Sequence, residues 1–162
     1  MMIINPFEVI NSCMEKAPVD VKGIIEKLNI EINFIDLGAD LSGVIEQKKD
    51  GRYLICVNDK DHVNRQRFTM AHELGHYIYH RDKIGNGIED NRMYRGIYNS
   101  DKYNNAIGNK EETQANQFAA NLLMPWSLIL KLRAENLSDD KIAESLQVSR
   151  AALKIRLEDF MS

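Results

Sequence analysis

The spacing of apolar residues over positions 5–30 predicts two helices. Apolar residues at positions 7, 9 and 10 indicate a short first helix. A second helix is indicated in "APVDVKGIIEKLNI", where apolar residues recur at i, i+3, i+4 and i+7, namely Val21, Ile24, Ile25 and Leu28. Pro18 marks the break between the two helices, because proline does not continue a helix.

An alternating pattern then predicts a small antiparallel sheet. In "EINFIDL" the alternation places Ile32, Phe34 and Leu37 toward a core. The segments "SGVIEQ" and "RYLICVN" alternate in the same way. They are joined by "QKKDGR", in which Asp50-Gly51 is a strong hairpin signal.

A longer helix is predicted from about Asn64 to His80, and it has two distinct faces. One stripe is apolar and is expected to face the core, and a second stripe is polar. The apolar stripe consists of Phe68, Ala71, Leu74 and Ile78, and the polar stripe of Thr69, His72, Glu73, His76 and His80.

The pattern is helical again from Glu111 to Leu123 and is ended by Pro125. The tail "LSDDKIAESLQVSRAALKIRLEDFM" predicts two more helices with a tight turn near Gln147. Residues 81–110, rich in Gly, Asn and Asp, are long for a structureless connection, so this segment is expected to be functional or mobile. Its tyrosines are candidates to assist a reaction, and the sequence does not select among Tyr94, Tyr98 and Tyr103.

The composition indicates one globular domain that can bury a core. The chain has 162 residues, of which 44% are hydrophobic and 28% charged. A net charge of -3 provides no overall basic surface for nucleic acid. Cys13 and Cys56 lie far apart, which favours reduced thiols in the cytosol. The sequence shows neither a signal-peptide pattern nor the ~18 apolar residues of a membrane span, so we expect a cytoplasmic protein.

The polar stripe contains "HELGH", the spacing of a zinc hydrolase. His72 and His76 lie four residues apart, so their side chains leave the same side of the helix, about 6 Å apart at Cβ. Two ring nitrogens at that separation can reach one zinc ion at about 2.0–2.1 Å. Glu73 can reach a water on the metal and act as the general base. A chance match is the alternative, but three of the four histidines lie on one helical face within nine residues.

A third zinc ligand can come from two patterns. The metzincin pattern requires a glycine three residues after the second histidine, and Tyr79 occupies that position, so Asp82 is disfavoured. The other pattern takes a glutamate from a downstream helix. In "EETQANQFAANLLMP", Glu112 has Asn116 one turn later, and Asn116 could orient a ligand histidine. A pair of acidic residues that complements the helix dipole is the alternative, and it suits Glu111 better than Glu112.

Close contact between these two helices is also expected. Gly75 in mid-helix costs about 1 kcal/mol relative to alanine, which indicates a packing reason. The alanines at 115, 119 and 120 would allow the approach. His80 lies about 12 Å from His72 along the axis, too far for the same metal, and is expected to be a satisfied or rim residue. Arg65 and Arg67 are expected to be solvated or ion-paired, and contact with a substrate is the alternative.

The segments "RQRFTMAHELGHYIYH" and "EETQANQFAANLLMP" resemble the ImmA/IrrE family of bacterial zinc metallopeptidases. The match covers about residues 53–125 apart from the loop, and is looser elsewhere. The resemblance implies zinc ligation by His72, His76 and Glu112, with Glu73 as the catalytic base. With the predicted elements it implies an α+β fold: a zincin-like core (residues 1–130) with a small antiparallel sheet and a metal helix packed on a second ligand helix, followed by a helix-turn-helix-like extension (131–162).

The resemblance also implies a substrate. Members resemble anti-repressors that cut helix-turn-helix (Xre-type) repressors, often from phages or mobile elements, and some act in toxin and antitoxin pairs. The alternative is a transcription-associated binding module, with an inert or structural zinc, that acts through its tail. A DNA role would use Arg150, Lys154 and Arg156 after the N-cap Ser149. It is disfavoured because residues 138–162 carry four basic and five acidic side chains.

Overall fold

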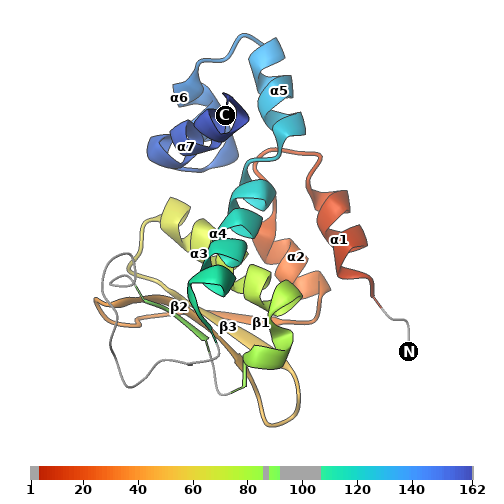
Figure 1. The fold of residues 1–162 in the computed structure, drawn as a ribbon, viewed down its shortest axis with the longest axis vertical. Coiled ribbons are helices and arrows are strands. Elements are labelled where there is room, and N and C mark those ends of the chain that lie inside the picture. The colour runs from red at the N-terminus through yellow and green to blue at the C-terminus, as the bar shows by residue number, and fades with distance from the viewer. Residues whose placement is uncertain (1–3, 86–87, 92–106, 162) are drawn as a thin grey trace.

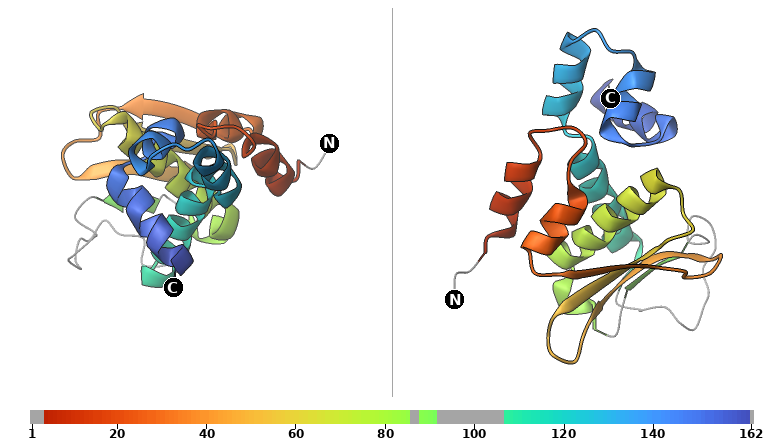
Figure 2. Two further views of the ribbon diagram at one scale, coloured as in Figure 1. Left: turned by 90° about the horizontal axis from the view of Figure 1, so that it is seen from above. Right: turned by 180° about the vertical axis from the view of Figure 1, so that it is seen from behind.

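A mixed sheet with helices stacked on one side forms the α+β fold of this protein (Figures 1 and 2). The computed structural model describes residues 4–85, 88–91 and 107–161. Helices α1 to α4 lie on the same side of the sheet, and α5 to α7 lie farther from it. None of the helices formed by the described residues is long and apolar enough to cross a bilayer.

The first two helices match the apolar pattern. Helix α1 spans Pro6–Cys13 and α2 spans Val21–Lys27. Each begins at a side-chain cap: Asn5 accepts a hydrogen bond from a backbone N–H of α1, and Asp20 accepts one from α2. The segment between them contains Pro18, as predicted.

The sheet contains β1 (Glu31–Ile35), β2 (Leu41–Gln47), β3 (Tyr53–Asn58) and β4 (Ile88–Asn91), in the order β1-β3-β2-β4. The hairpin of β2 and β3 is antiparallel, as the Asp-Gly turn predicts, and β4 is antiparallel to β2. Strand β1, however, pairs in parallel with β3, so the sheet is mixed rather than purely antiparallel. A turn signal sets the pairing of adjacent strands only, and β1 lies beyond β3 instead of beside β2.

Strand β1 is therefore an edge strand, and this corrects one expectation about the core. Phe34 remains 39% exposed, although alternation placed it inside. Its neighbour Ile35 is also exposed, whereas Ile32 is partly buried and packs against the core. A strand with only one neighbour has less surface to bury its side chains against.

Helix α3 spans Val63–Tyr79 and α4 spans Asn109–Leu123. The fourth histidine, His62, caps the start of α3 through its Nδ1. The two helices pack closely where α3 has its glycine: a Cβ on Gly75 would lie 3.2 Å from Cα of Ala115. Ala115 and Ala119 are fully buried at this contact. The close approach expected from the small residues is thus present.

Between α3 and α4 the structure describes a short 3-10 helix, Arg81–Lys83, and strand β4. Strand β4 lies in the segment for which the sequence predicts no element. Most of the remaining connection, including Tyr94, Tyr98 and Tyr103, lies outside the described residues.

Three helices follow Pro125: α5 (Trp126–Ala134), α6 (Asp139–Leu146) and α7 (Arg150–Met161). Helix α5 is not among the predicted elements. The turn between α6 and α7 is the predicted one: Gln147 has a left-handed backbone, with φ of 52°, and Ser149 accepts a hydrogen bond from a backbone N–H of α7.

Arg67 connects these C-terminal helices to α3. Its guanidinium donates to the carbonyl oxygens of Val19, at 3.0 Å, and Leu146, at 3.5 Å. The residue is only 8% exposed, so the expectation of a solvated or ion-paired side chain is wrong for Arg67. Leu146 is the last residue of α6, where a positive charge is favourable to the helix dipole.

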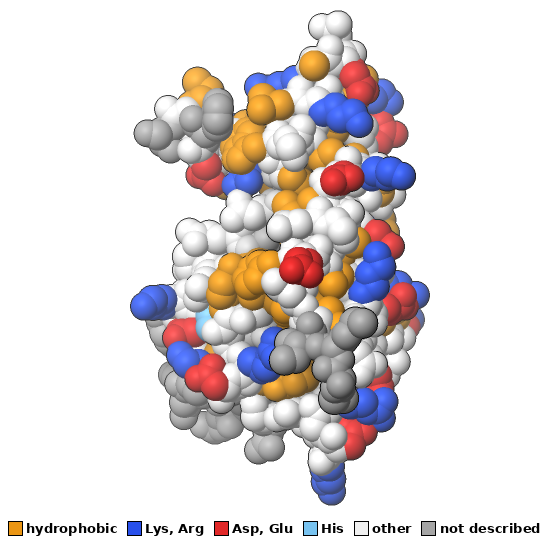
Figure 3. All heavy atoms as spheres, turned by 90° about the vertical axis from the view of Figure 1, so that its right-hand side faces the viewer, with side chains coloured by type: hydrophobic (Ala, Val, Ile, Leu, Met, Phe, Trp, Pro, Cys, Tyr) orange, Lys and Arg blue, Asp and Glu red, His pale blue; other side chains and the backbone are white. Residues whose placement is uncertain are grey.

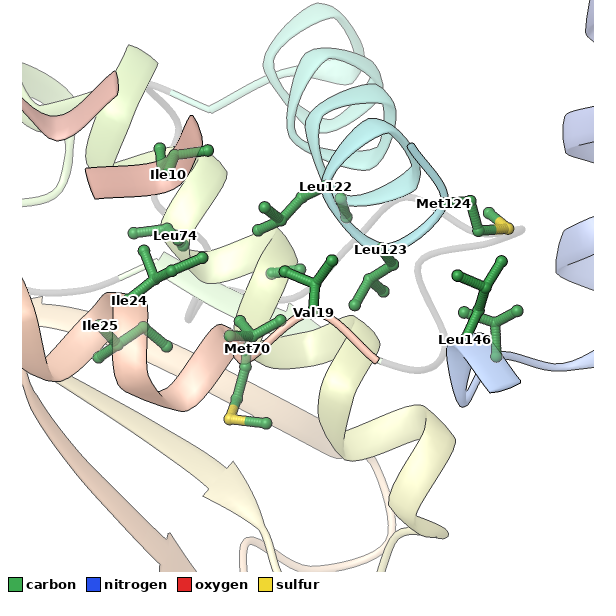
Figure 4. Close-up of a cluster of buried hydrophobic side chains, with 14 of the residues drawn as sticks. Ile10, Val19, Ile24, Ile25, Met70, Leu74, Leu122, Leu123, Met124 and Leu146 are labelled. Atoms are coloured by element: carbon green, nitrogen blue, oxygen red, sulfur yellow. The ribbon is translucent and has the colours of Figure 1, made fainter. Parts of the chain in front are cut away.

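One continuous apolar cluster extends from the N-terminal helices to the C-terminal ones (Figure 4). In the close-up, side chains of α2 and α3 meet those of α4, and Leu146 of α6 lies near Met124 at the end of α4. The cluster crosses position 130. The division of the chain into 1–130 and 131–162 stays a prediction.

Candidate metal centre

Helices α3 and α4 bring two histidines and a glutamate to one point. His72 and His76 are one turn apart on α3, and Glu112 lies in the first turn of α4. One potential ligand atom from each of the three lies within 4.8 Å of the others. His72 and His76 are 2% and 0% exposed, so their ring nitrogens lie in a site that is shielded from solvent.

The distances among these atoms fit a tetrahedral ion. Nε2 of His72 lies 3.1 Å from Nε2 of His76. Oε2 of Glu112 lies 3.2 Å from Nε2 of His72, and Oε1 of Glu112 lies 3.3 Å from Nε2 of His76. A tetrahedron of ligands at about 2.0 Å from zinc has edges of about 3.3 Å. The separations among the three side chains are thus close to those edges.

The protonation states suit ligands of a cation. Burial lowers the pKa of His76, and the His72 and His80 rings add to this, against the raising effect of Glu112. For Glu112, burial raises the pKa, but the adjacent His72 and His76 rings outweigh it and bring the pKa to about 2. Near neutral pH the site therefore holds a neutral imidazole at His76 and a carboxylate at Glu112, the forms that bind metals.

Asn116 lies where it can orient the first histidine. Its Oδ1 is 2.9 Å from Nδ1 of His72. An amide oxygen only accepts, so Nδ1 of His72 carries the hydrogen and Nε2 is left with its lone pair toward His76 and Glu112. Histidine ligands of metals usually have such a partner on their second nitrogen.

Glu73 is fully buried beside the sheet. A Cβ built on Gly43 of β2 would lie 3.6 Å from Oε1 of Glu73 and would overlap the methyl group of Thr69. The glycine therefore allows α3 to lie directly on β2. Glu73 directly follows His72 on α3, so the predicted base lies on the helix that carries both predicted histidine ligands.

His80 does not lie at a rim. It is 3% exposed, with its two ring nitrogens 2.9 Å from Nδ1 of His76 and 2.9 Å from Oε1 of Gln114. It is a satisfied histidine, as one of the two expectations had it. Gln114 is the polar residue near the site that the sequence reasoning missed. The sequence does indicate that His80, which contacts Gln114, lies near His76, because the two histidines are one helical turn apart.

Arg65 lies at the other end of the polar face of α3. Its guanidinium donates to Oγ of Ser42 through two nitrogens, each at 3.2 Å, and lies 5.9 Å from the centre of the Phe68 ring. Ser42 precedes Gly43 on β2, so this contact also fixes α3 on the sheet. The expectation of a solvated or ion-paired side chain does not include these contacts of Arg65 with Ser42 and Phe68.

A comparison with protein-family models identifies the family of this chain. The model of the peptidase M78 family, described as "IrrE N-terminal-like domain", matches residues 25–158. The chain belongs to the peptidase M78 family. The matched range includes α3 and α4, which form the candidate centre, and most of the C-terminal helices. The family model therefore covers both the candidate site and the tail of this M78 protein.

This M78 chain is similar to parts of two larger proteins. It is 26% identical over 132 residues to the phage-like element PBSX protein XkdA of Bacillus subtilis, a match over 82% of this chain and 56% of that protein. Its fold is similar to that of a Mycobacterium tuberculosis transcriptional regulator, with a TM-score of 0.57 and 17% identity over 94% of this chain and 44% of that one. The M78 chain thus spans about half the length of each of these two proteins.

Proposed function

We propose that the protein is a zinc-dependent endopeptidase whose metal is held by His72, His76 and Glu112. The observation that carries this proposal is the set of distances of 3.1–3.3 Å among the two Nε2 atoms and the Glu112 carboxylate, which match the edges of a zinc tetrahedron. Membership of a peptidase family supports the same reaction class. Zinc bound there would polarise the scissile carbonyl and make the attacking water more acidic.

The remaining chemistry belongs to Glu73. Its carboxylate follows the first ligand on α3 and takes a proton from the water as the water oxygen bonds to the scissile carbonyl carbon. The same carboxyl group then gives that proton to the nitrogen of the departing amine as the C–N bond breaks. The burial of Glu73 between α3 and β2 limits the positions its carboxylate can take. The two histidines and Glu112 take no proton in this sequence.

We propose a helix-turn-helix transcriptional repressor as the substrate. Two of the proteins that this chain resembles support this proposal. XkdA is a protein of a phage-like element, and a protein of similar fold is a transcriptional regulator. Cleavage of such a repressor would derepress its genes. A toxin and antitoxin role would use the same reaction with a different cellular result.

A DNA-binding role for the C-terminal helices has less support. Arg150 forms an ion pair with Asp140, and Arg156 lies 4.8 Å from the Trp126 ring centre and donates to a backbone carbonyl. Lys154 is the remaining residue of the predicted basic set. Its Nζ lies 3.9 Å from a carboxylate oxygen of Glu158, which is a weak ion pair. On the face that Figure 3 shows, positive and negative side chains are interspersed. This is not the single-sign surface that phosphate backbones attract.

Two variants test the proposal. We expect the wild-type protein and Glu73→Gln to bind one zinc per chain with equal affinity, and Glu112→Ala to bind it much more weakly, in a competition assay with a chromophoric chelator. Proteome-wide labelling of new N-termini, in cells that express wild type or Glu73→Gln, then tests cleavage. New termini in a helix-turn-helix protein, seen only with wild type, are expected. Zinc binding without any wild-type-specific terminus would refute the peptidase assignment.

A further inference from the structure

The second ligand histidine is connected to the protein surface by a chain of polar contacts. Nδ1 of His76 lies 2.9 Å from Nδ1 of His80, and Nε2 of His80 lies 2.9 Å from Oε1 of Gln114. His76 and His80 are buried, whereas Gln114 is exposed on α4. The contact between two histidines is informative because each neutral ring has one nitrogen that donates and one that accepts.

Only one direction of donation along this chain leaves His76 able to bind a metal. If the Gln114 oxygen accepts, Nε2 of His80 donates to it, and Nδ1 of His80 has a lone pair that accepts from Nδ1 of His76. Nε2 of His76 then has its lone pair directed toward His72 and Glu112. In the reverse direction, with the Gln114 amide nitrogen donating, Nε2 of His76 would carry a hydrogen and would repel a cation.

A residue of α4 supports Nδ1 of each proposed ligand histidine, once directly and once through a third histidine. Asn116 contacts Nδ1 of His72 directly, and Gln114 reaches Nδ1 of His76 through His80. The His80 ring lies on the Nδ1 side of His76, whereas Nε2 of His76 faces the other ligands. His80 therefore contacts a ligand, and is not itself a ligand of the same ion.

We propose that Gln114 and His80 are positioning residues that fix the tautomer and ring orientation of His76. This inference rests on the metal site proposed above and assigns to that site a support that reaches it from α4. Removing a partner on the second nitrogen of a histidine ligand typically lowers metal affinity by about 10–100-fold. The same loss is expected here when the acceptor at position 114 is removed.

The test uses Gln114, because an exposed residue can be changed without opening the core. Gln114→Leu removes the acceptor, and Gln114→Glu keeps an oxygen that accepts from His80. Gln117→Leu changes another exposed glutamine of α4 and is the matched control. Zinc affinity is measured by chelator competition. We expect the zinc Kd to rise about 10–100-fold for Gln114→Leu and to stay at the wild-type value for the other two.

A second measurement separates positioning from a general structural effect. Two-bond ¹H–¹⁵N spectra of the metal-free protein report which ring nitrogen of His76 carries hydrogen. We expect hydrogen on Nδ1 in wild type, Gln114→Glu and Gln117→Leu, and a mixture in Gln114→Leu. A wild-type protein that does not bind zinc would overturn the proposed function. Zinc binding in wild type with an unchanged Kd and tautomer in Gln114→Leu would overturn this inference alone.

Discussion

Replacing Gly75 with alanine tests whether the spacing of α3 and α4 sets the metal site. Gly75 lies on α3 between the two ligand histidines. A methyl group there would lie 3.1 Å from Cδ1 of Phe118, 3.2 Å from Cα of Ala115 and 3.3 Å from the Ala115 carbonyl oxygen, where ordinary contacts begin at 3.4 Å. Two of these atoms belong to the α4 backbone, so the helix itself must shift by a few tenths of an ångström.

Two effects on stability oppose each other in this variant. Alanine is favoured over glycine inside a helix by about 1 kcal/mol. Overpacking of a well-packed contact costs about 1–3 kcal/mol. The sum predicts that the free energy of unfolding of the metal-free protein falls by about 0–2 kcal/mol.

The effect on zinc should be larger than the effect on folding. Glu112 lies three residues before Ala115 on α4 and moves with it, while His72 and His76 remain on α3. Protein ligands fit a metal within about 0.2 Å, so a shift of this size disturbs the site. We expect the zinc Kd to rise about tenfold, which is about 1.4 kcal/mol of binding free energy.

Urea denaturation of the metal-free protein and chelator competition measure the two quantities. Phe118→Leu in the Gly75→Ala background serves as the control, because it relieves the side-chain contact and leaves the backbone contacts. Zinc affinity should therefore stay low in the double variant. A Gly75→Ala protein that is about 1 kcal/mol more stable and binds zinc like wild type would refute the reasoning, since α4 would then be free to adjust.

Four further outcomes are expected. Asn116→Leu should raise the zinc Kd about 10–100-fold, measured by the same competition. Arg67→Met should lower the free energy of unfolding by about 1–3 kcal/mol in urea, because the carbonyl oxygens of Val19 and Leu146 each lose a buried donor; no change would show that these contacts are replaced. Hydrogen bonds from Lys83 and a backbone N–H lower the pKa of Glu111 to about 2 from 4.5. The resulting stability is present above pH 4.5 and lost toward pH 2, so acid titration should show a smaller loss of stability in Glu111→Gln than in wild type. Chelation of zinc should lower the unfolding temperature of wild type and leave that of Glu112→Ala unchanged.

Local patterns were sufficient for most elements, and long-range pairing was not. The period of the apolar residues located α3 and α4 to within two residues at each end. The Asp50-Gly51 turn identified the hairpin because such a turn acts on the two strands beside it. No local signal places β1 next to β3 in parallel, since this pairing depends on competition among strands for one neighbour. Helix α5 was missed because the run "LIL" has neither a helical nor an alternating period.

Local spacing likewise predicts some residues of the candidate site, whereas others depend on how distant helices pack. His72, Glu73 and His76 are fixed relative to one another by the helix itself, so their spacing alone predicts their shared face. Glu112 required an assumption about which later helix packs on α3, and the structure does bring it there. His80 was judged by its distance from His72, which excludes it as a ligand but does not exclude contact with His76. Gln114 could be found only from coordinates, because its helix face is exposed.

The contributions of the two helices suggest why metal binding and the packing of α4 must be coupled. Helix α3 supplies both proposed ligand histidines and the proposed base. Helix α4 supplies Glu112 and Asn116, which contact the histidine rings directly, and Gln114, which contacts them through His80. Each contact spans the interface at which Gly75 meets Ala115. Movement of α4 relative to α3 would therefore remove a ligand and the supports of both histidines together, while the residues of α3 kept their helical spacing. A bound partner that shifted α4 would therefore act on the proposed metal site as well as on the core, to which Ala119, Leu122 and Leu123 of α4 belong.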